Sequence, residues 1–148
     1  MLYLFNDMKF NYNDGGRSKS IKRSKQTNDC TVIALALALS MDYDIAYDFL
    51  KKMGRKSGQG FHLNLLLDGI IETGGSINEY IFKKHSFPAL KGQPRMNVER
   101  FLNAYPKGIY IIRVAKHMAC VKDGVLTDTH TCNHFKKCVY TAFECLKK

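Results

Sequence analysis

One cysteine stands where a thiol could act as a nucleophile. The segment KQTNDCTVIALALALSM (residues 25–41) places Cys30 at the head of the longest apolar run, directly after the polar turn QTND. The reactive form of cysteine is the thiolate, and a helix N-terminus or a neighbouring imidazolium lowers the pKa of a thiol. Thr27, Asn28 and Asp29 are good N-cap residues, so a helix is expected to begin here. Alternatively, Cys30 is a small buried hydrophobic residue, as most free cysteines are.

A predicted hairpin near the C-terminus supplies a base for this thiol. In HMACVKDGVLTDTH (residues 117–130), the pair Asp123-Gly124 separates two alternating runs, which is typical of a two-residue β-turn. Such a turn puts His117 and Asp128 on one face as diagonal neighbours, about 7–8 Å apart between backbones. The carboxylate can then orient the imidazole and favour its charged form. The same turn predicts the cross-strand pairs Lys122–Val125 and Val121–Leu126.

Acyl transfer also requires hydrogen-bond donors for the oxyanion that develops on the substrate. The backbone N–H of Cys30, at the expected start of the helix, is one candidate donor. The side-chain amide of Gln26, four residues upstream, is a second candidate. The alternative for Gln26 is an ordinary polar residue of a loop.

The elements that must position these residues are helices followed mainly by strands. Hydrophobic patterning and capping residues predict helices over about 29–41, 42–54, 61–75 and 96–108. Strands are predicted at 108–114, 116–122, 124–130 and 138–146, with a short strand at 77–82 and an edge strand within 1–16. This order predicts an α+β fold, in which a central buried helix carries Cys30 and packs on a C-terminal antiparallel sheet.

The length of 148 residues suits a single domain spanning residues 1–148. We expect an N-terminal strand and basic arm over 1–25, a mainly helical part over 26–106 and the antiparallel sheet over 107–148. No apolar stretch is long enough to span a bilayer, and the N-terminus is not typical of a signal peptide. We therefore expect a cytoplasmic protein with no membrane partner, whose five cysteines are reduced thiols.

The net charge of +10 is concentrated in the segment GRSKSIKRSK (residues 16–25). Such an arm can be a solvated surface, or it can attract nucleic acid or an acidic protein. The basic residues available for such a partner are Arg17, Lys19, Lys22, Arg23 and Lys25. A binding module that uses this arm without turnover is the alternative to an enzyme.

The segment HTCNHFKKC (residues 130–138) supplies thiols and imidazoles that could bind a metal. The candidate zinc ligands are Cys132, His134, Cys138 and Cys145, with His130 as a spare. Their spacing is looser than that of a true C-x-x-C pair, and the later thiols suit strand packing. The loop GRKSGQG lacks the Gly-Lys-Ser/Thr ending of a P-loop. We therefore predict no metal and no cofactor.

Two of these motifs together resemble a known family. QTNDC on a buried helix, followed by a distant HMACVKDGVLTDT, is similar to papain-like cysteine peptidases, and most of all to their C39 peptidase-like branch. It also resembles small phage proteins that begin with NDCTVxAL and end with H-x-x-x-V-x-D-G-V-x-x-D. The resemblance spans roughly residues 25–130. It implies Cys30 as nucleophile, His117 as general base, Asp128 as orienting acid, and Gln26 in the place of the oxyanion glutamine.

The resemblance also implies an activity. A papain-like domain with these residues would be a thiol-dependent amide hydrolase, cleaving a peptide or isopeptide bond, or an acyl transferase. Its substrate would be a peptide or a protein. If the chain is phage-encoded, as the similar proteins are, it would act on a host or phage protein in the host cytoplasm.

Overall fold

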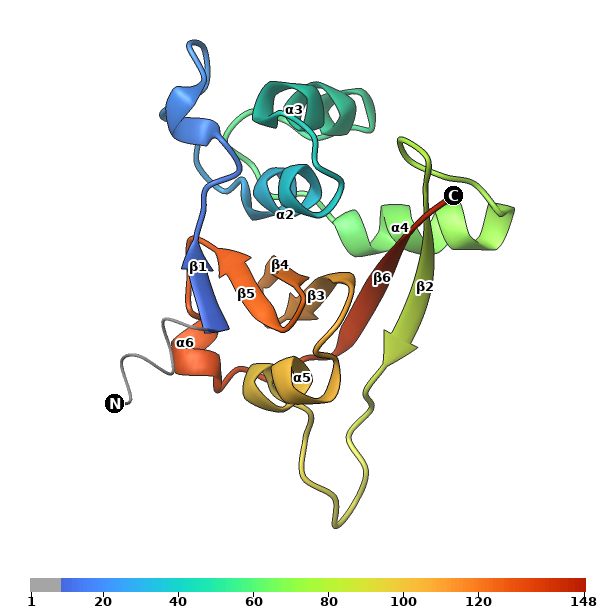
Figure 1. The fold of residues 1–148 in the computed structure, drawn as a ribbon. Coiled ribbons are helices and arrows are strands. Elements are labelled where there is room, and N and C mark those ends of the chain that lie inside the picture. Colours follow the sequence, from blue (N-terminus) through green and yellow to red (C-terminus); the bar gives the residue numbers. More distant parts are fainter. Residues whose placement is uncertain (1–8) are drawn as a thin grey trace.

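The computed structural model describes residues 9–148, which form a six-stranded sheet with helices on both faces (Figure 1). The strands are β1 (Phe10–Tyr12), β2 (Tyr80–Ser86), β3 (Ile109–Val114), β4 (His117–Lys122), β5 (Val125–Asp128) and β6 (Thr141–Lys147). A 3₁₀ turn, η1 (Arg17–Lys19), precedes the helices α2 (Cys30–Ala38), α3 (Tyr43–Lys52), α4 (Leu63–Thr73), α5 (Val98–Ala104) and α6 (Cys132–Phe135). The predicted α+β class is confirmed.

The strands within 107–148 pair antiparallel, as predicted, whereas the sheet as a whole is mixed. Its strand order is β1-β5-β4-β3-β6-β2, and β1 runs parallel to β5, with Phe10 opposite Leu126. This pairing joins segments more than a hundred residues apart, and a three-residue edge strand has no local signal for its direction. The edge strand predicted within 1–16 is present as β1. Residues 1–8 of that prediction lie outside the described residues.

The strand predicted at 77–82 begins later and runs further than expected. Asn78 and Glu79 both have positive φ and make a tight turn, which Ile77 and Tyr80 close. The strand therefore starts at Tyr80 and continues to Ser86 through polar residues, which an edge strand can expose. It joins the sheet through β6, so the part of the chain predicted as mainly helical also supplies a strand.

The predicted hairpin is confirmed, together with its register. Asp123 and Gly124 both have positive φ, as the favoured two-residue turn requires. Lys122 lies opposite Val125, and the pair Val121–Leu126 follows it, as predicted. The turn is held by the carboxylate of Asp123, which accepts a hydrogen bond from the backbone N–H of Gly108.

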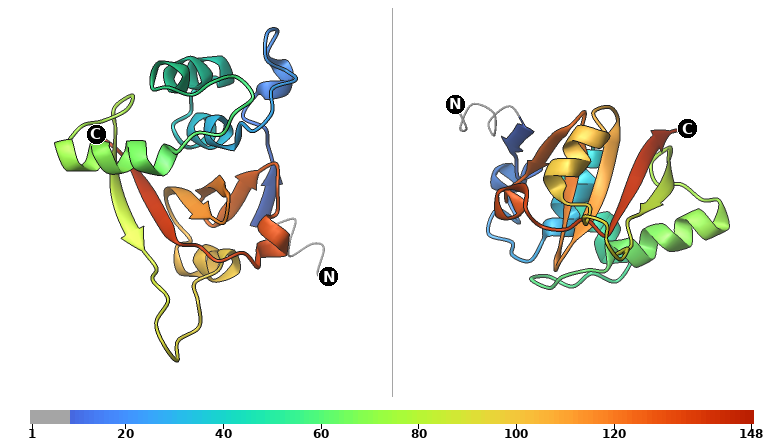
Figure 2. Two further views of the ribbon diagram at one scale, coloured as in Figure 1. Left: turned by 180° about the vertical axis from the view of Figure 1, so that it is seen from behind. Right: turned by 90° about the horizontal axis from the view of Figure 1, so that it is seen from below.

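The central strands present alternate residues to two apolar clusters, because successive side chains of a strand point to opposite faces. Ile111, Met118 and Cys120 pack with residues of α2, α3 and α4. Ile112 and Ala119 pack with residues of α5 and α6 on the other face. Figure 2 shows these layers from behind and from below.

Helix α2 lies between the sheet and α3, which explains why its sequence is apolar on every side (Figure 1). All its residues from Thr31 to Ala38 are buried, whereas Cys30 at its first position is half-buried. The long apolar run thus fixes the position of the helix end that carries the thiol. Within residues 9–148, no single helix is long and apolar enough to cross a membrane.

Candidate active site

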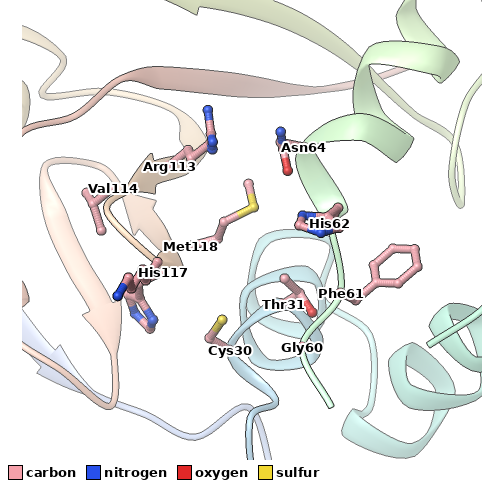
Figure 3. Close-up of a pocket in the computed structure, with 11 residues that line it drawn as sticks. Cys30, Thr31, Gly60, Phe61, His62, Asn64, Arg113, Val114, His117 and Met118 are labelled. Atoms are coloured by element: carbon pink, nitrogen blue, oxygen red, sulfur yellow. The ribbon is translucent and has the colours of Figure 1, made fainter. Parts of the chain in front are cut away.

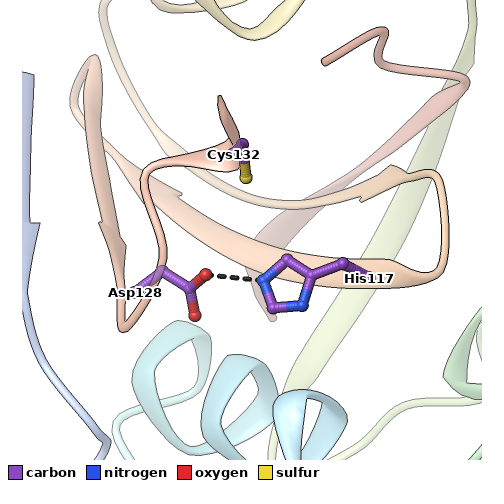
Figure 4. A group of neighbouring side chains, drawn as sticks. All are labelled: His117, Asp128 and Cys132. Carbon is purple, nitrogen blue, oxygen red and sulfur yellow. Dashed lines mark hydrogen bonds and ion pairs between the residues drawn. The ribbon is translucent and has the colours of Figure 1, made fainter. Parts of the chain in front are cut away.

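The hairpin places an imidazole against a buried carboxylate. His117 is the first residue of β4 and Asp128 is the last residue of β5. Nε2 of His117 lies 2.6 Å from Oδ2 of Asp128, which also accepts the backbone N–H of His130 at 3.4 Å (Figure 4). Asp128 is fully buried, and only 12% of the His117 side chain is exposed. The carboxylate therefore fixes the orientation of the ring and occupies one of its two nitrogens.

Cys30 lies beside the same imidazole, at the start of α2 (Figure 3). Burial by itself raises the pKa of the Cys30 thiol. Hydrogen bonds with His117 and with the backbone N–H of Met118, and the charge of His117, together outweigh burial and lower that pKa below its ordinary value. The structure therefore brings together the three residues predicted as nucleophile, base and orienting acid.

The pKa of His117 changes in the complementary direction. Burial lowers it, but hydrogen bonds with Asp128 and Cys30, together with their charges, raise it to about 9. A lowered thiol pKa and a raised imidazole pKa both favour the thiolate–imidazolium pair. This is the form in which cysteine is a nucleophile without first losing a proton to another base.

The N-terminus of α2 is left open toward the thiol. Asp29 is the N-cap residue, but its side chain makes no capping hydrogen bond. Its Oδ1 instead accepts a hydrogen bond from Arg17 at 2.9 Å, and its Oδ2 accepts the hydroxyl of Tyr43 at 2.7 Å. The first backbone N–H groups of the helix therefore remain available to a negative charge at Cys30 or on a bound substrate.

The turn before Cys30 is held by a buried arginine. Arg55 is 3% exposed and donates hydrogen bonds to the backbone carbonyls of Thr27 and Asn28 and to the side-chain oxygen of Gln26. Asn28, which has positive φ, donates in turn to the carbonyl of Gly58. The GRKSGQG loop therefore fixes the QTND turn.

Gln26 is in the lining of the Cys30 pocket, but its amide is engaged with the same loop. Its Oε1 accepts the backbone N–H of Gly58 at 2.6 Å, and its Nε2 donates to Ser57 at 3.3 Å. Of the two N–H groups on Nε2, Ser57 accepts one, and the other remains for another acceptor. The proposed oxyanion role of Gln26 stays a prediction, and the contacts observed are those of a residue that positions the turn.

Cys30 and His117 lie where two pockets adjoin. A pocket of about 440 Å³ includes Phe61, His62 and Arg113, and it is the one drawn in Figure 3. A second pocket, of about 610 Å³, extends along the QTND turn to His130. Both pockets include Cys30, Lys116 and His117. A chain that occupied both would therefore pass over the thiol.

The basic arm contributes less free charge than its sequence suggests. Arg17 is bound to Asp29, and Arg23 is bound to Asp44 and Asp48 at 3.1 and 2.8 Å while its guanidinium stacks over Tyr47. These two arginines attach the arm to α2 and α3. The remaining basic residues of the arm are exposed, and within residues 9–148 they form no ion pair: Lys19, Lys22 and Lys25.

The candidate zinc ligands named from the sequence do not form one cluster in the described residues. Cys132 packs in the apolar cluster next to α5, whereas Cys145 packs in the cluster next to α2, across the sheet. In the described part of the chain, the potential ligands that do approach one another are His117, Asp128 and Cys132 (Figure 4). The 2.6 Å contact between His117 and Asp128 is shorter than the separation of about 3.3 Å between two ligands of a tetrahedral zinc.

Some contacts of the site had no signal in the sequence. The backbone N–H of Met118 reaches the thiol because β4 passes the end of α2, and Lys116 enters both pockets from the turn before β4. Met118 lies within HMACVKDGVLTDT, but the spacing of that motif does not point to its backbone N–H, and no motif points to Lys116. No family model matches the chain, and no curated protein or solved structure matches it.

Proposed function

We propose that the protein is a papain-like thiol enzyme that hydrolyses an amide bond or transfers its acyl group, with a peptide or protein as substrate. The observation that carries the proposal is the 2.6 Å contact between His117 and Asp128, with Cys30 beside the same imidazole where the two pockets adjoin. A buried histidine–carboxylate pair can be purely structural. Here the imidazole also faces a thiol of lowered pKa, which lies at a helix N-terminus and between two pockets. This arrangement favours catalysis instead.

The proposed reaction has two steps. In the first, the thiolate of Cys30 attacks the amide carbonyl carbon, and the oxyanion that forms is stabilised by N–H groups at the start of α2. The carbon–nitrogen bond then breaks as the imidazolium of His117 gives its proton to the leaving amine, which leaves a thioester on Cys30.

In the second step, His117 takes a proton from water, or from an acceptor amine, as that nucleophile attacks the thioester. The thiolate is released as the leaving group, and the imidazolium is restored. Asp128 holds the ring in one orientation throughout.

Site-resolved alkylation with iodoacetamide tests the activated thiol. At about pH 6 an ordinary thiol is almost fully protonated, so rapid labelling at this pH reports a thiolate. We expect Cys30 to react at least tenfold faster than Cys138, a second half-buried thiol, as read by peptide mass spectrometry. Cys120 and Cys132 are buried and their pKa values are raised to about 12, so they should not react.

Two variants complete this test. Cys30→Ala should abolish the rapid phase, and the matched control Cys138→Ala should retain it. Equal labelling of Cys30 and Cys138 in the wild-type protein would contradict the proposal. A second measurement distinguishes an amide-bond enzyme from a merely reactive thiol. After incubation with a peptide mixture, an amide-bond enzyme should carry a thioester on Cys30, which hydroxylamine releases.

A further inference from the structure

The surface around Cys30 carries positive charge with no free carboxylate near it. Among the residues that line the two pockets, Lys25, Arg113 and Lys116 are exposed, and within the described residues none of them forms an ion pair. The single carboxylate in that lining is Asp29, which is bound to Arg17 and Tyr43. The charges of Asp29 and Arg17 offset each other, and the thiolate, the imidazolium and the carboxylate of Asp128 together carry one negative charge. Three unpaired cations remain.

Lys116 is the cation best placed to act on a substrate. It lies in the turn between β3 and β4, immediately before His117, and it lines both pockets that meet at the thiol. It also contributes to a third pocket, with His130 and Lys137. Its own φ is positive, which a lysine rarely adopts, so the turn holds this residue in a costly conformation at the edge of the site.

We propose that the enzyme selects substrates with a carboxylate beside the scissile amide, and that Lys116 and Arg113 bind this carboxylate. The inference rests on the proposed function, and it names its substrate class. It assigns the recognition of acidic partners to the pocket and not to the basic arm. Both arginines of the arm are already paired with Asp29, Asp44 and Asp48. Arg113 and Lys116 line the pockets beside the thiol, whereas Lys19 and Lys22 of the arm lie outside the lining of both pockets.

The test compares two alkylating agents that differ only in charge, iodoacetate and iodoacetamide, on Cys30. We expect a ratio of rate constants that favours the anion and decreases as the salt concentration rises. Lys116→Asn should lower this ratio about fivefold, and Arg113→Gln should lower it in the same direction. Asparagine tolerates positive φ, so Lys116→Asn removes the charge and keeps the turn. Lys22→Asn removes an exposed charge outside both pockets and should leave the ratio unchanged.

Peptide probes extend the test to the substrate. Of two peptide fluoromethyl ketones that differ only in Glu or Gln next to the electrophile, the Glu probe should inactivate the wild-type protein several-fold faster. Lys116→Asn should abolish this difference. Equal rates for both probes, or an iodoacetate preference unchanged in Lys116→Asn and Arg113→Gln, would overturn the inference while rapid labelling of Cys30 still supported the enzyme. Slow labelling of Cys30 by every probe would instead overturn the proposed function.

Discussion

His117 and Asp128 are held 2.6 Å apart by one hairpin, whose two strands are fixed in register by a two-residue turn. The carboxylate is fully buried, and the imidazole bridges it to the thiol of Cys30. Because the hairpin packs on α2 through Met118 and Cys120, the same contacts that build the core also bring the helix end to the imidazole. The geometry of the site is therefore a direct product of the sheet and its central helix.

Replacing Asp128 with asparagine should lower the pKa of His117. The carboxylate is the main partner that raises this pKa to about 9, and asparagine keeps the shape of the side chain without its charge. We expect the pKa to fall toward the ordinary value of about 6.5 in an NMR titration of the His117 ring protons. Glu99→Gln, which neutralises an exposed acid at the start of α5, should leave it unchanged. A His117 titration that is the same in both variants would contradict the assigned pairing.

Replacing His117 with glutamine should slow alkylation of Cys30 by about two orders of magnitude at about pH 6, because the thiol returns to an ordinary pKa. The matched control is His85→Gln. His85 also pairs with a carboxylate, that of Glu144 at 3.0 Å, but it lies on β2, outside the lining of both pockets. The measurement is the pseudo-first-order rate with iodoacetamide. Equal rates in the two variants would show that the imidazole does not activate the thiol.

Amide turnover should follow a bell-shaped pH profile. The acid limb reports protonation of Cys30, so it should lie below the ordinary thiol pKa, because that pKa is lowered. The alkaline limb reports loss of the His117 proton that the leaving amine requires, and it should fall near pH 9. Activity is thus expected across neutral pH, with loss in both directions. A profile that rises without limit through pH 9 would mean that protonated His117 is not required.

Removing Asp29 should destabilise the protein although it is not part of the triad. Its buried carboxylate joins Arg17 to Tyr43, and Asp29→Ala leaves both without this partner. We expect a loss of about 2–3 kcal/mol in the free energy of unfolding by urea, and about 1–2 kcal/mol for Tyr43→Phe, which removes one hydrogen bond. Asp48→Ala breaks an exposed ion pair, so it should change stability by less than about 1 kcal/mol. A loss for Asp29→Ala no larger than this control would refute the bridging role.

Local signals in the sequence were sufficient for much of the site. Asp123-Gly124 has a strong preference for one turn, and the turn determines which residues lie opposite each other, so the contact of His117 with Asp128 follows from sequence. The helix predicted from about residue 96 begins at Val98, because the side chain of Asn97 caps it by accepting the backbone N–H of Arg100. The apolar run after Cys30 likewise predicts a buried helix, since only a central helix can bury every side.

The remaining features depend on pairings between distant segments, for which a single sequence carries no signal. Nothing near Phe10 indicates that β1 runs parallel to β5. The sequence does not show that the arginines of the basic arm are ion-paired while its lysines are not. Only the fold brings Asp29, Asp44 and Asp48 to Arg17 and Arg23. The partner of Gln26 is likewise distant: the nearest donor to its side-chain oxygen is the backbone N–H of Gly58, 32 residues later.

The most direct test of the Cys30–His117–Asp128 assembly is the ionisation of the Cys30 thiol, measured from the ultraviolet absorbance of the thiolate. The Cys30 contribution is the difference between the wild-type protein and Cys30→Ser, followed across pH. We predict a thiolate that forms below the ordinary thiol pKa and a transition that returns to that value in His117→Gln. A Cys30 thiol that ionises at or above its ordinary pKa, and is unaffected by His117→Gln, would contradict the assignment of an activated nucleophile.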